Sequence, residues 1–235
     1  YIRLEPKVIG PCIALGLAIF IMQASESVIS ICFNSSLLQY GGDVAVGAMT
    51  ILTSVMQFAM LPLQGLGQGA QPIISYNYGA RNATRVKDTF RLLLKASLCY
   101  STLLWALVMI FPQMFAAMFT ADPGLLEFTK TALRIYMACL LLFGIQIACQ
   151  MTFTSLGKAK ASILVAVMRK FILLIPLIYI LPQIFRVDQT MSVYMAEPVA
   201  DFLAVAFTSV LFTFQFRKVM AQISDNKPKK EMENR

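Results

Sequence analysis

The sequence predicts an all-α integral membrane protein that folds as a bundle of six transmembrane helices. Hydrophobic residues make up 58% of the 235 residues and charged residues only 14%, against roughly 25% charged in an average soluble domain. The mean hydropathy is +0.69. Three long stretches carry no charge at all: Val44–Ala80, Ala96–Ala121 and Ile135–Gly157. Each exceeds the roughly 20 apolar residues that cross a bilayer as a helix, which argues against a disordered chain and an ordinary soluble domain.

Charged or turn-forming segments divide the chain into its helices in order. We expect the helices at about 8–37, 44–76, 86–118, 125–155, 159–184 and 190–217. The first follows Arg3 and Lys7, and the loops between successive helices lie around Tyr40–Asp43, Arg81–Arg91, Asp122–Lys130, Lys158–Lys160 and Arg186–Asp188. Residues 1–220 therefore form one six-helix transmembrane domain. Residues 221–235 are expected to form a polar cytoplasmic tail.

Lysine and arginine are distributed unevenly among these loops. Fourteen of them lie before the first helix, in the third and fifth loops and in the tail, but only two, Lys130 and Arg186, lie in the alternate loops. Cytoplasmic loops of membrane proteins carry such an excess of basic residues. Both ends of the chain are therefore expected in the cytoplasm. The distribution also explains the net charge of +8 without nucleic-acid binding.

Proline and glycine residues within the apolar spans predict bends and close packing. Proline is tolerated in transmembrane helices and often marks bends. The positions expected to bend or pack helices are Pro62, Pro72, Pro176 and Pro198, together with Gly65 and Gly69. The two glycines form a GxxxG step, which suits close helix contact.

Polar residues form stripes on the apolar helices, because residues three or four apart share a helix face. The stripes are Gln23, Glu26, Ser30 and Asn34; Gln57, Gln64, Gln68, Gln71 and Ser75; Gln146, Gln150 and Thr154; and Glu197, Asp201, Thr208 and Gln215. Such stripes indicate either hydrogen bonds between helices, worth about 0.6 kcal/mol each, or a water-filled cavity. Both interpretations stay open for the Gln and Ser residues alone.

Ionisable residues within the spans favour the cavity. An unpaired charge at the bilayer centre costs at least about 2.5–3.5 kcal/mol, so these residues must face the protein interior. Among them are Glu26, Arg134, Arg169, Lys170, Glu197 and Asp201. We expect Arg134, Arg169 and Glu197 to form a buried charge network. Glu26 has no obvious basic partner, and it is the best candidate for a carboxylate that binds and releases a cation.

Several classes of function are excluded. The sequence has no histidine, which removes His-based triads and the usual zinc sites. It also has no Walker A motif, and its five cysteines lie within apolar spans, where they are typical of small core residues. We therefore expect neither an enzyme nor a cofactor.

Four segments together resemble the multidrug and toxic compound extrusion (MATE) family of transporters, in its MepA-like branch. The most specific is QPIISYNYGARN within Leu61–Arg91. The others are NSSLLQYGGDVAVGAMTI at Asn34–Ile51, TSLGKAKASILVAVMRKFILLIPLIYILP at Thr154–Pro182, and AEPVADF at Ala196–Phe202. The resemblance covers nearly the whole chain except the tail.

The resemblance implies an architecture and an activity. MATE transporters have twelve helices in two six-helix lobes, and they exchange H⁺ or Na⁺ for organic, often cationic, drugs or metabolites by alternating access. This chain resembles the C-terminal lobe, helices seven to twelve. Because Tyr1 stands where an initiator Met would, we expect the first lobe to precede this segment and to be its partner. The implied location is the bacterial inner membrane.

The resemblance also assigns site residues. Glu26 matches the acidic residue of the seventh helix in the sodium-coupled branch, so Na⁺ could bind there, and Gln23 and Asn34 match polar positions of that helix. The second acidic residue of that branch, in the tenth helix, is missing, and Gln146 and Gln150 occupy its region. The cation- or substrate-binding set expected from stripes and resemblance together is Gln23, Glu26, Ser30, Asn34, Gln146, Gln150 and Asp201. The coupling ion, H⁺ or Na⁺, stays open.

Two alternatives accompany this interpretation. A lipid-linked saccharide flippase of the related superfamily would need several unpaired basic residues around a pyrophosphate, whereas three acids face three bases here. A non-transporting structural subunit would not need Glu26 or the aligned glutamines.

Overall fold

The computed structural model describes the backbone of residues 6–158, 164–186 and 188–225, and the side chains among them from residue 24 to residue 223. Its elements are all helical: α1 (Pro6–Gly79), α2 (Ala83–Ile110), α3 (Pro112–Ala117), α4 (Pro123–Tyr136), η1 (Leu140–Leu142), α5 (Phe143–Ser155), η2 (Met168–Leu174), α7 (Ile175–Ile184) and α8 (Gln189–Asp225). No strand occurs within these ranges. The expected all-α class is confirmed.

α1 consists of two helical arms that meet at Gly42, where the backbone has φ 64° and ψ −160°. The sequence predicts a loop around Tyr40–Asp43, but the structure turns the chain there at a single glycine. The bend is fastened to the start of α8, because Thr190 Oγ1 donates a hydrogen bond of 2.9 Å to the Tyr40 carbonyl. A Cβ atom at Gly41 would lie 2.5 Å from Thr190 Cγ2, so only glycine allows this close approach.

Two of the other predicted helices are interrupted. The predicted helix 86–118 is broken at Phe111 (φ −119°, ψ 50°), and Pro112 then begins α3. The predicted helix 125–155 is bent by 42° between Tyr136 and Leu140, although this segment contains neither proline nor glycine. By contrast, α1 stays helical through Pro62 and Pro72. Proline positions alone therefore misplace the breaks.

The fifth predicted helix, 159–184, begins outside the described residues. Residues 164–167 are helical, η2 is a π-helix, and α7 follows with Pro176 in its first turn. The sixth predicted helix, 190–217, is contained in α8, which stays helical through Pro198. Residues 221–225 of the expected tail continue α8, and the rest of that tail lies outside the described residues.

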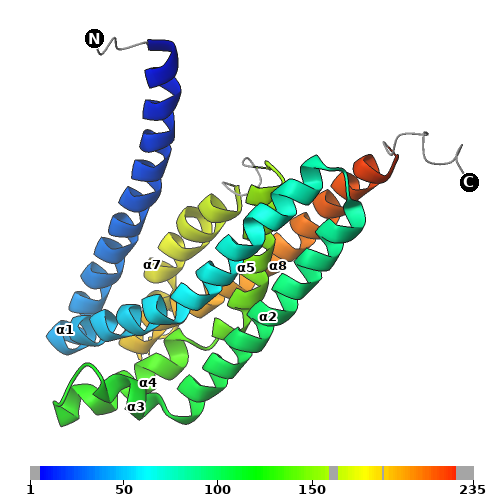
Figure 1. The fold of residues 1–235 in the computed structure, drawn as a ribbon. Helices are drawn as coiled ribbons and strands as arrows, with labels where there is room; N and C mark the ends of the chain where they lie inside the picture. The colour runs from blue at the N-terminus through cyan, green and yellow to red at the C-terminus, as the bar shows by residue number, and fades with distance from the viewer. Residues whose placement is uncertain (1–5, 159–163, 187, 226–235) are drawn as a thin grey trace, which may run out of the picture.

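Four helices of the described residues are long and apolar enough to cross a membrane, or five if the bent pair from Pro123 to Ser155 is one span. This count takes both arms of α1 as a single helix. Figure 1 shows that the start of α1, the α1–α2 connection and the end of α8 lie at one end of the molecule. The Gly42 bend, α3 and α4 lie at the opposite end. The chain thus alternates between two ends, as the predicted topology requires, while six crossings and their orientation stay predictions.

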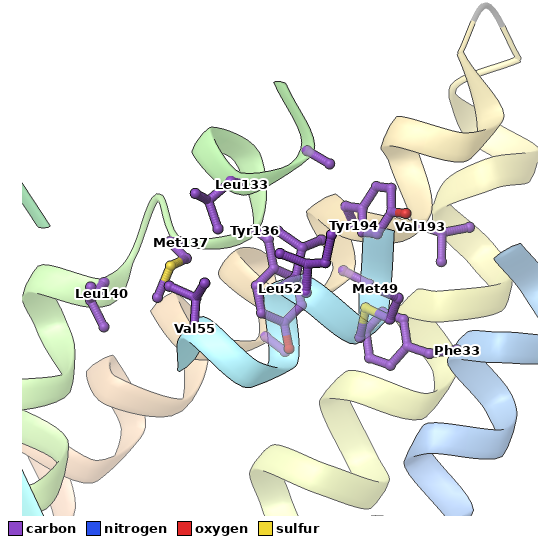
Figure 2. Close-up of a cluster of buried hydrophobic side chains, with 14 of the residues drawn as sticks. Phe33, Met49, Leu52, Val55, Leu133, Tyr136, Met137, Leu140, Val193 and Tyr194 are labelled. Atoms are coloured by element: carbon purple, nitrogen blue, oxygen red, sulfur yellow. The ribbon is translucent and has the colours of Figure 1, made fainter. Parts of the chain in front are cut away.

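The main core lies where both arms of α1 meet α4, α7 and α8. Its side chains include Phe33, Leu52, Leu133, Tyr136 and Tyr194, all at most 5% exposed, and Figure 2 shows them converging from separate helices. The Tyr194 hydroxyl donates a 2.7 Å hydrogen bond to the Ala45 carbonyl. This bond satisfies the one polar atom of a fully buried ring.

A second core joins α2, α5 and α8 through an aromatic group made of Phe90, Phe153, Phe212 and Phe216. The rings of Phe212 and Phe216 stack with centroids 4.9 Å apart, and Phe90 lies 4.7 Å from Phe212. Such pairs stabilise by about 0.5–1.5 kcal/mol beyond the area that they bury. They hold the first part of α2 against the last part of α8.

Close helix packing occurs at other glycines than predicted. A Cβ atom at Gly65 or Gly69 would meet nothing within 4 Å, so the expected GxxxG contact is wrong within the described chain. Instead, Gly67 lies against Met151 of α5, and Gly144 lies against the backbone of α2 at Ser97 and Leu98. The tight contacts therefore join α5 to α1 and α2.

Candidate functional site

Arg169 of η2 lies between two carboxylates of α8. Its Nε donates to Asp201 Oδ1 at 2.6 Å, and its Nη2 donates to Glu197 Oε1 at 2.7 Å. Glu197 and Asp201 are four residues apart, so they occupy the same face of α8 one turn from each other. We call these three residues the Arg169 cluster.

The side chains of the Arg169 cluster have little access to solvent. The side chains of Glu197 and Asp201 are 8% and 3% exposed, and that of Arg169 is 20% exposed. The guanidinium also lies 5.2 Å from the centre of the Phe143 ring, a distance at which the ring attracts the cation. Water therefore contributes little to stabilising these charges, and the protein groups must do so.

The next residue of η2, Lys170, faces a different helix. Its Nζ contacts Glu26 Oε1 on the first arm of α1. The Lys170 side chain is 16% exposed, whereas that of Glu26 is 58% exposed. η2 therefore connects α8 through Arg169 and α1 through Lys170. π-helical turns of this kind are frequent at functional sites.

The contact between Glu26 and Lys170 corrects the sequence prediction. The expectation that Glu26 has no basic partner is wrong. The two residues are separated by 144 positions, so no spacing pattern could have joined them. The available signal was the presence of Lys170 within an apolar span, because an intramembrane base needs a partner.

Two further residues of the first polar stripe face outward. Ser30 and Asn34 are exposed, like Glu26, and Gln23 lies outside the residues whose side chains are described. Glu26, Ser30 and Asn34 thus form an open polar surface on the first arm of α1. Lys170 contacts it at Glu26.

The stripe on the second arm of α1 is also mostly exposed. Gln57, Gln64 and Gln68 are exposed and Gln71 is half-buried. Ser75 differs, because its hydroxyl donates a 3.0 Å hydrogen bond to the Ser155 carbonyl of α5. The glutamines therefore do not form the interior of this helix bundle, and they are available to a cavity or to another part of a larger assembly.

The glutamines of α5 lie deeper. Gln146 is 5% exposed, and its Oε1 has no hydrogen-bond partner among the described residues. Gln150 is half-buried. Neither side chain forms a hydrogen bond with Glu26 or the Arg169 cluster in the described part of the chain. The structure therefore does not bring the expected binding residues together in one pocket.

Arg134 lies outside the Arg169 cluster, so the expected buried network of Arg134, Arg169 and Glu197 needs correction. Arg134 is exposed at the end of α4. It lines an open hollow of about 550 Å³ together with Cys139, Pro198 and Phe202. The third member of the network, besides Arg169 and Glu197, is Asp201 and not Arg134.

The positions of the possible metal ligands do not support a metal site within the described residues. The described residues contain no group of three or more His, Cys, Asp or Glu side chains placed to hold a metal ion. Glu26, which the resemblance makes a possible Na⁺ ligand, has the ammonium group of Lys170 against its carboxylate.

Comparison with known proteins gives consistent matches. The MatE family model matches residues 18–180. The multidrug export protein MepA of Staphylococcus haemolyticus (strain JCSC1435) is 26% identical over 192 residues, which are 81% of this chain and 42% of that protein. MepA of Staphylococcus aureus (strain NCTC 8325 / PS 47) is 25% identical over 198 residues, 84% of this chain and 43% of that protein. The chain thus spans less than half the length of these curated relatives.

Solved structures match the fold over most of the chain. The MATE multidrug transporter DinF-BH, solved as a complex, superposes with a TM-score of 0.76 at 36% identity, covering 93% of this chain and 48% of that one. A MATE structure in a bent conformation superposes with a TM-score of 0.83 at 16% identity, covering 95% of this chain and 49% of that one. The second match concerns the fold alone.

Proposed function

Because the chain belongs to the MatE family of membrane transporters, and not to a family of enzymes, we propose that it forms the C-terminal six-helix lobe of a multidrug exporter. Its substrates are organic, often cationic, drugs or metabolites, exchanged for H⁺ or Na⁺ by alternating access. The MepA relatives are named as multidrug export proteins, which supports drug export. The proposed partner is a second six-helix lobe, and the proposed location is the bacterial inner membrane with both ends cytoplasmic.

One observation carries this proposal: Glu26 is an exposed carboxylate on a polar stripe of an otherwise apolar helix. A fixed charge at such a position is costly unless it faces a cavity or a partner charge. A lipophilic cation that enters the cavity can pair with this carboxylate.

Lys170 gives the site a built-in competitor. In the structure, its ammonium neutralises Glu26. A bound organic cation, a proton or Na⁺ would have to displace this ammonium, because one carboxylate neutralises one positive charge. Competition of this kind permits exchange, provided that the occupied states differ in the side to which the cavity opens.

The flippase alternative is less well supported by the charges. Arg169 is paired with two carboxylates and Lys170 with a third. Neither base is left free to hold a pyrophosphate. A purely structural subunit would leave the exposed polar stripes of α1 without a role.

The test is resistance to a cationic drug in cells that express the protein as its gene encodes it. We expect Glu26→Gln to abolish ethidium export, because the amide is close in size but cannot neutralise a cation, and Glu26→Asp to retain part of it. Glu127→Gln is the matched control, since Glu127 is an exposed carboxylate that pairs with Lys130 on α4 at 3.1 Å. Wild-type export by Glu26→Gln, at equal membrane expression, would show that Glu26 is not the cation site.

A further inference from the structure

The charges around η2 do not balance. Lys170 and Glu26 form one neutral pair. Arg169, with a single positive charge, contacts both Glu197 and Asp201. If every group were ionised, the Arg169 cluster would carry one uncompensated negative charge.

Within the described part of the chain, no further base acts on these two carboxylates. The groups that face Glu197 electrostatically are Asp201, Arg169, Glu26 and Lys170, from α8, η2 and α1. On α4, the buried Tyr136 lies within range of both carboxylates. On α5, the Arg169 guanidinium faces the uncharged Phe143 ring.

Bulk water has little access to the two carboxylates. The side chains of Glu197 and Asp201 are 8% and 3% exposed, and the described residues contain no group of three or more His, Cys, Asp or Glu side chains placed to hold a metal ion. Arg134, the base that the sequence assigned to this network, is exposed on α4 and lies outside the cluster. A buried carboxylate without its own cation is neutralised most readily by a proton.

We infer that Glu197 and Asp201 together hold one exchangeable proton, and that the Arg169 cluster is therefore a proton-binding site separate from Glu26. In the protonated state, one carboxyl group is neutral, the other is an anion, and Arg169 balances it. On release, the carboxyl O–H bond breaks, the proton passes to water, and the electron pair stays on the carboxylate. The cluster then changes from neutral to a charge of minus one.

The position of Arg169 suggests how this change reaches the cation site. Arg169 and Lys170 are consecutive residues of the same π-helical segment. When both α8 carboxylates are ionised, they hold Arg169 more strongly, and any movement of η2 toward α8 also moves Lys170 relative to Glu26. The link to drug export rests on the proposed function, whereas proton binding itself does not.

Infrared difference spectroscopy of the purified protein, as its gene encodes it, tests proton binding without drug or gradient. Wild-type protein at neutral pH should show the absorption of a protonated carboxyl group that is missing from both Glu197→Gln and Asp201→Asn. Each variant keeps one carboxyl group. This group stays ionised, because the charge of the Arg169 guanidinium balances a single carboxylate. Arg169→Gln should increase the absorption, and Glu127→Gln, on the surface of α4, should leave it unchanged.

The opposite outcomes overturn the inference. If the absorption is absent from wild type, or if either single variant retains it, the two carboxylates do not share a proton. Thermal melting gives a second readout: Glu197→Gln and Asp201→Asn should melt close to wild type, because an amide replaces a group that is already neutral half of the time. A large loss of melting temperature in both variants, with no spectral change, would identify a purely structural ion-pair cluster.

Transport assays in proteoliposomes separate this inference from the proposed function. Both variants should lose drug uptake that is driven by a pH gradient but retain exchange of labelled for unlabelled drug, which needs no net proton movement. Full gradient-driven uptake in either variant would contradict a coupling role for the cluster. If no drug moves in any protein, including wild type, the proposed function fails, and the infrared result still decides proton binding.

Discussion

At the residue scale, two glycines provide a direct test of the packing. A Cβ atom at Gly144 would lie 2.7 Å from the Ser97 carbonyl oxygen and 2.8 Å from the Leu98 nitrogen. Backbone atoms of α2 cannot rotate away, so Gly144→Ala should lower the free energy of unfolding by about 1–3 kcal/mol. Gly65→Ala meets no atom within 4 Å and should stabilise α1 by about 0.5–1 kcal/mol. Melting in detergent measures both, and equal effects would contradict the α2–α5 contact.

Among the charged residues around η2, replacement of Arg169 should lower the free energy of unfolding most. Arg169→Gln leaves the buried pair of Glu197 and Asp201 without a cation, and removal of one partner from a buried ion pair typically costs about 3–5 kcal/mol. Low pH should reduce this loss of stability, because protonation makes both carboxyl groups neutral and a cation is then no longer needed. We therefore expect the gap in melting temperature between wild type and Arg169→Gln to narrow as the pH falls. A gap that is constant with pH would indicate lost packing on Phe143 instead of lost charge.

Lys170 should act in the opposite direction on the cation site. Lys170→Gln removes the ammonium group that occupies Glu26, so a cationic drug no longer has to displace it. We expect tighter equilibrium binding of ethidium, measured by fluorescence polarisation, but slower export, because release also loses its competitor. Lys130→Gln is the control, since Lys130 contacts Glu127 on the surface of α4. Unchanged binding in Lys170→Gln would show that the contact does not compete with the drug.

At the element scale, the position of the helix breaks shows how far sequence reasoning reaches. The apolar pattern locates the helical segments, because an uncharged run of sufficient length has few other stable forms in a membrane. It does not locate the interruptions: Pro112 follows a break, Pro62 and Pro72 do not cause one, and the bend before Leu140 has no proline or glycine. Whether a proline interrupts a helix depends on whether neighbouring groups satisfy the freed carbonyl, which is tertiary information.

The same limit applies to the site. Helical spacing correctly places Glu197 and Asp201 on one face of α8, because that relation is local. The expected pairing of Arg169 with Glu197 is found. Spacing could not add Asp201 to that pair or join Lys170 to Glu26, since these contacts depend on how η2 lies between α8 and α1. The GxxxG expectation failed for a similar reason: small residues permit close contact but do not choose the face that a partner helix occupies.

The Gly42 bend is the element-scale feature that a single substitution tests best. Its φ of 64° and ψ of −160° fall in a region that is essentially restricted to glycine, and other residues cost about 1–3 kcal/mol there. No atom lies within 4 Å of a Cβ built at Gly42, so Gly42→Ala should destabilise through backbone strain alone. Gly69→Ala, in open space on the same helix, is the control. A melting temperature that does not change in Gly42→Ala would mean that the arms of α1 meet differently.

At the scale of the whole molecule, the topology can be tested by cysteine labelling. The basic loops predict that the end carrying the α1–α2 connection is cytoplasmic, and Figure 1 places the Gly42 bend at the other end. In a background without the native cysteines, Asp43→Cys should react with an impermeant reagent in intact cells. Thr84→Cys should react only after permeabilisation. Both positions are exposed, so a reversed pattern would invert the orientation and could not be attributed to burial.

The last prediction concerns what covers the outer surface of α1. Its second arm exposes Gln57, Gln64 and Gln68 within a helix that is apolar enough to cross a membrane. Against lipid these amides would lack hydrogen-bond partners, which is costly in hydrocarbon. A water-filled cavity between this lobe and a second lobe would solvate them.

We therefore expect these 235 residues, expressed alone, to export no ethidium, and co-expression of a first six-helix lobe to restore export. The joint substitution of Gln57, Gln64 and Gln68 by leucine should abolish the restored export and should not lower the melting temperature of the lobe in detergent, because no described residue depends on these amides. Substitution of the exposed Leu92 and Leu103 on α2 by methionine is the control for changes on a lipid-facing surface. Export by the purified chain as a monomer, or unimpaired export by the triple-leucine variant, would show that this surface does not line the transport pathway.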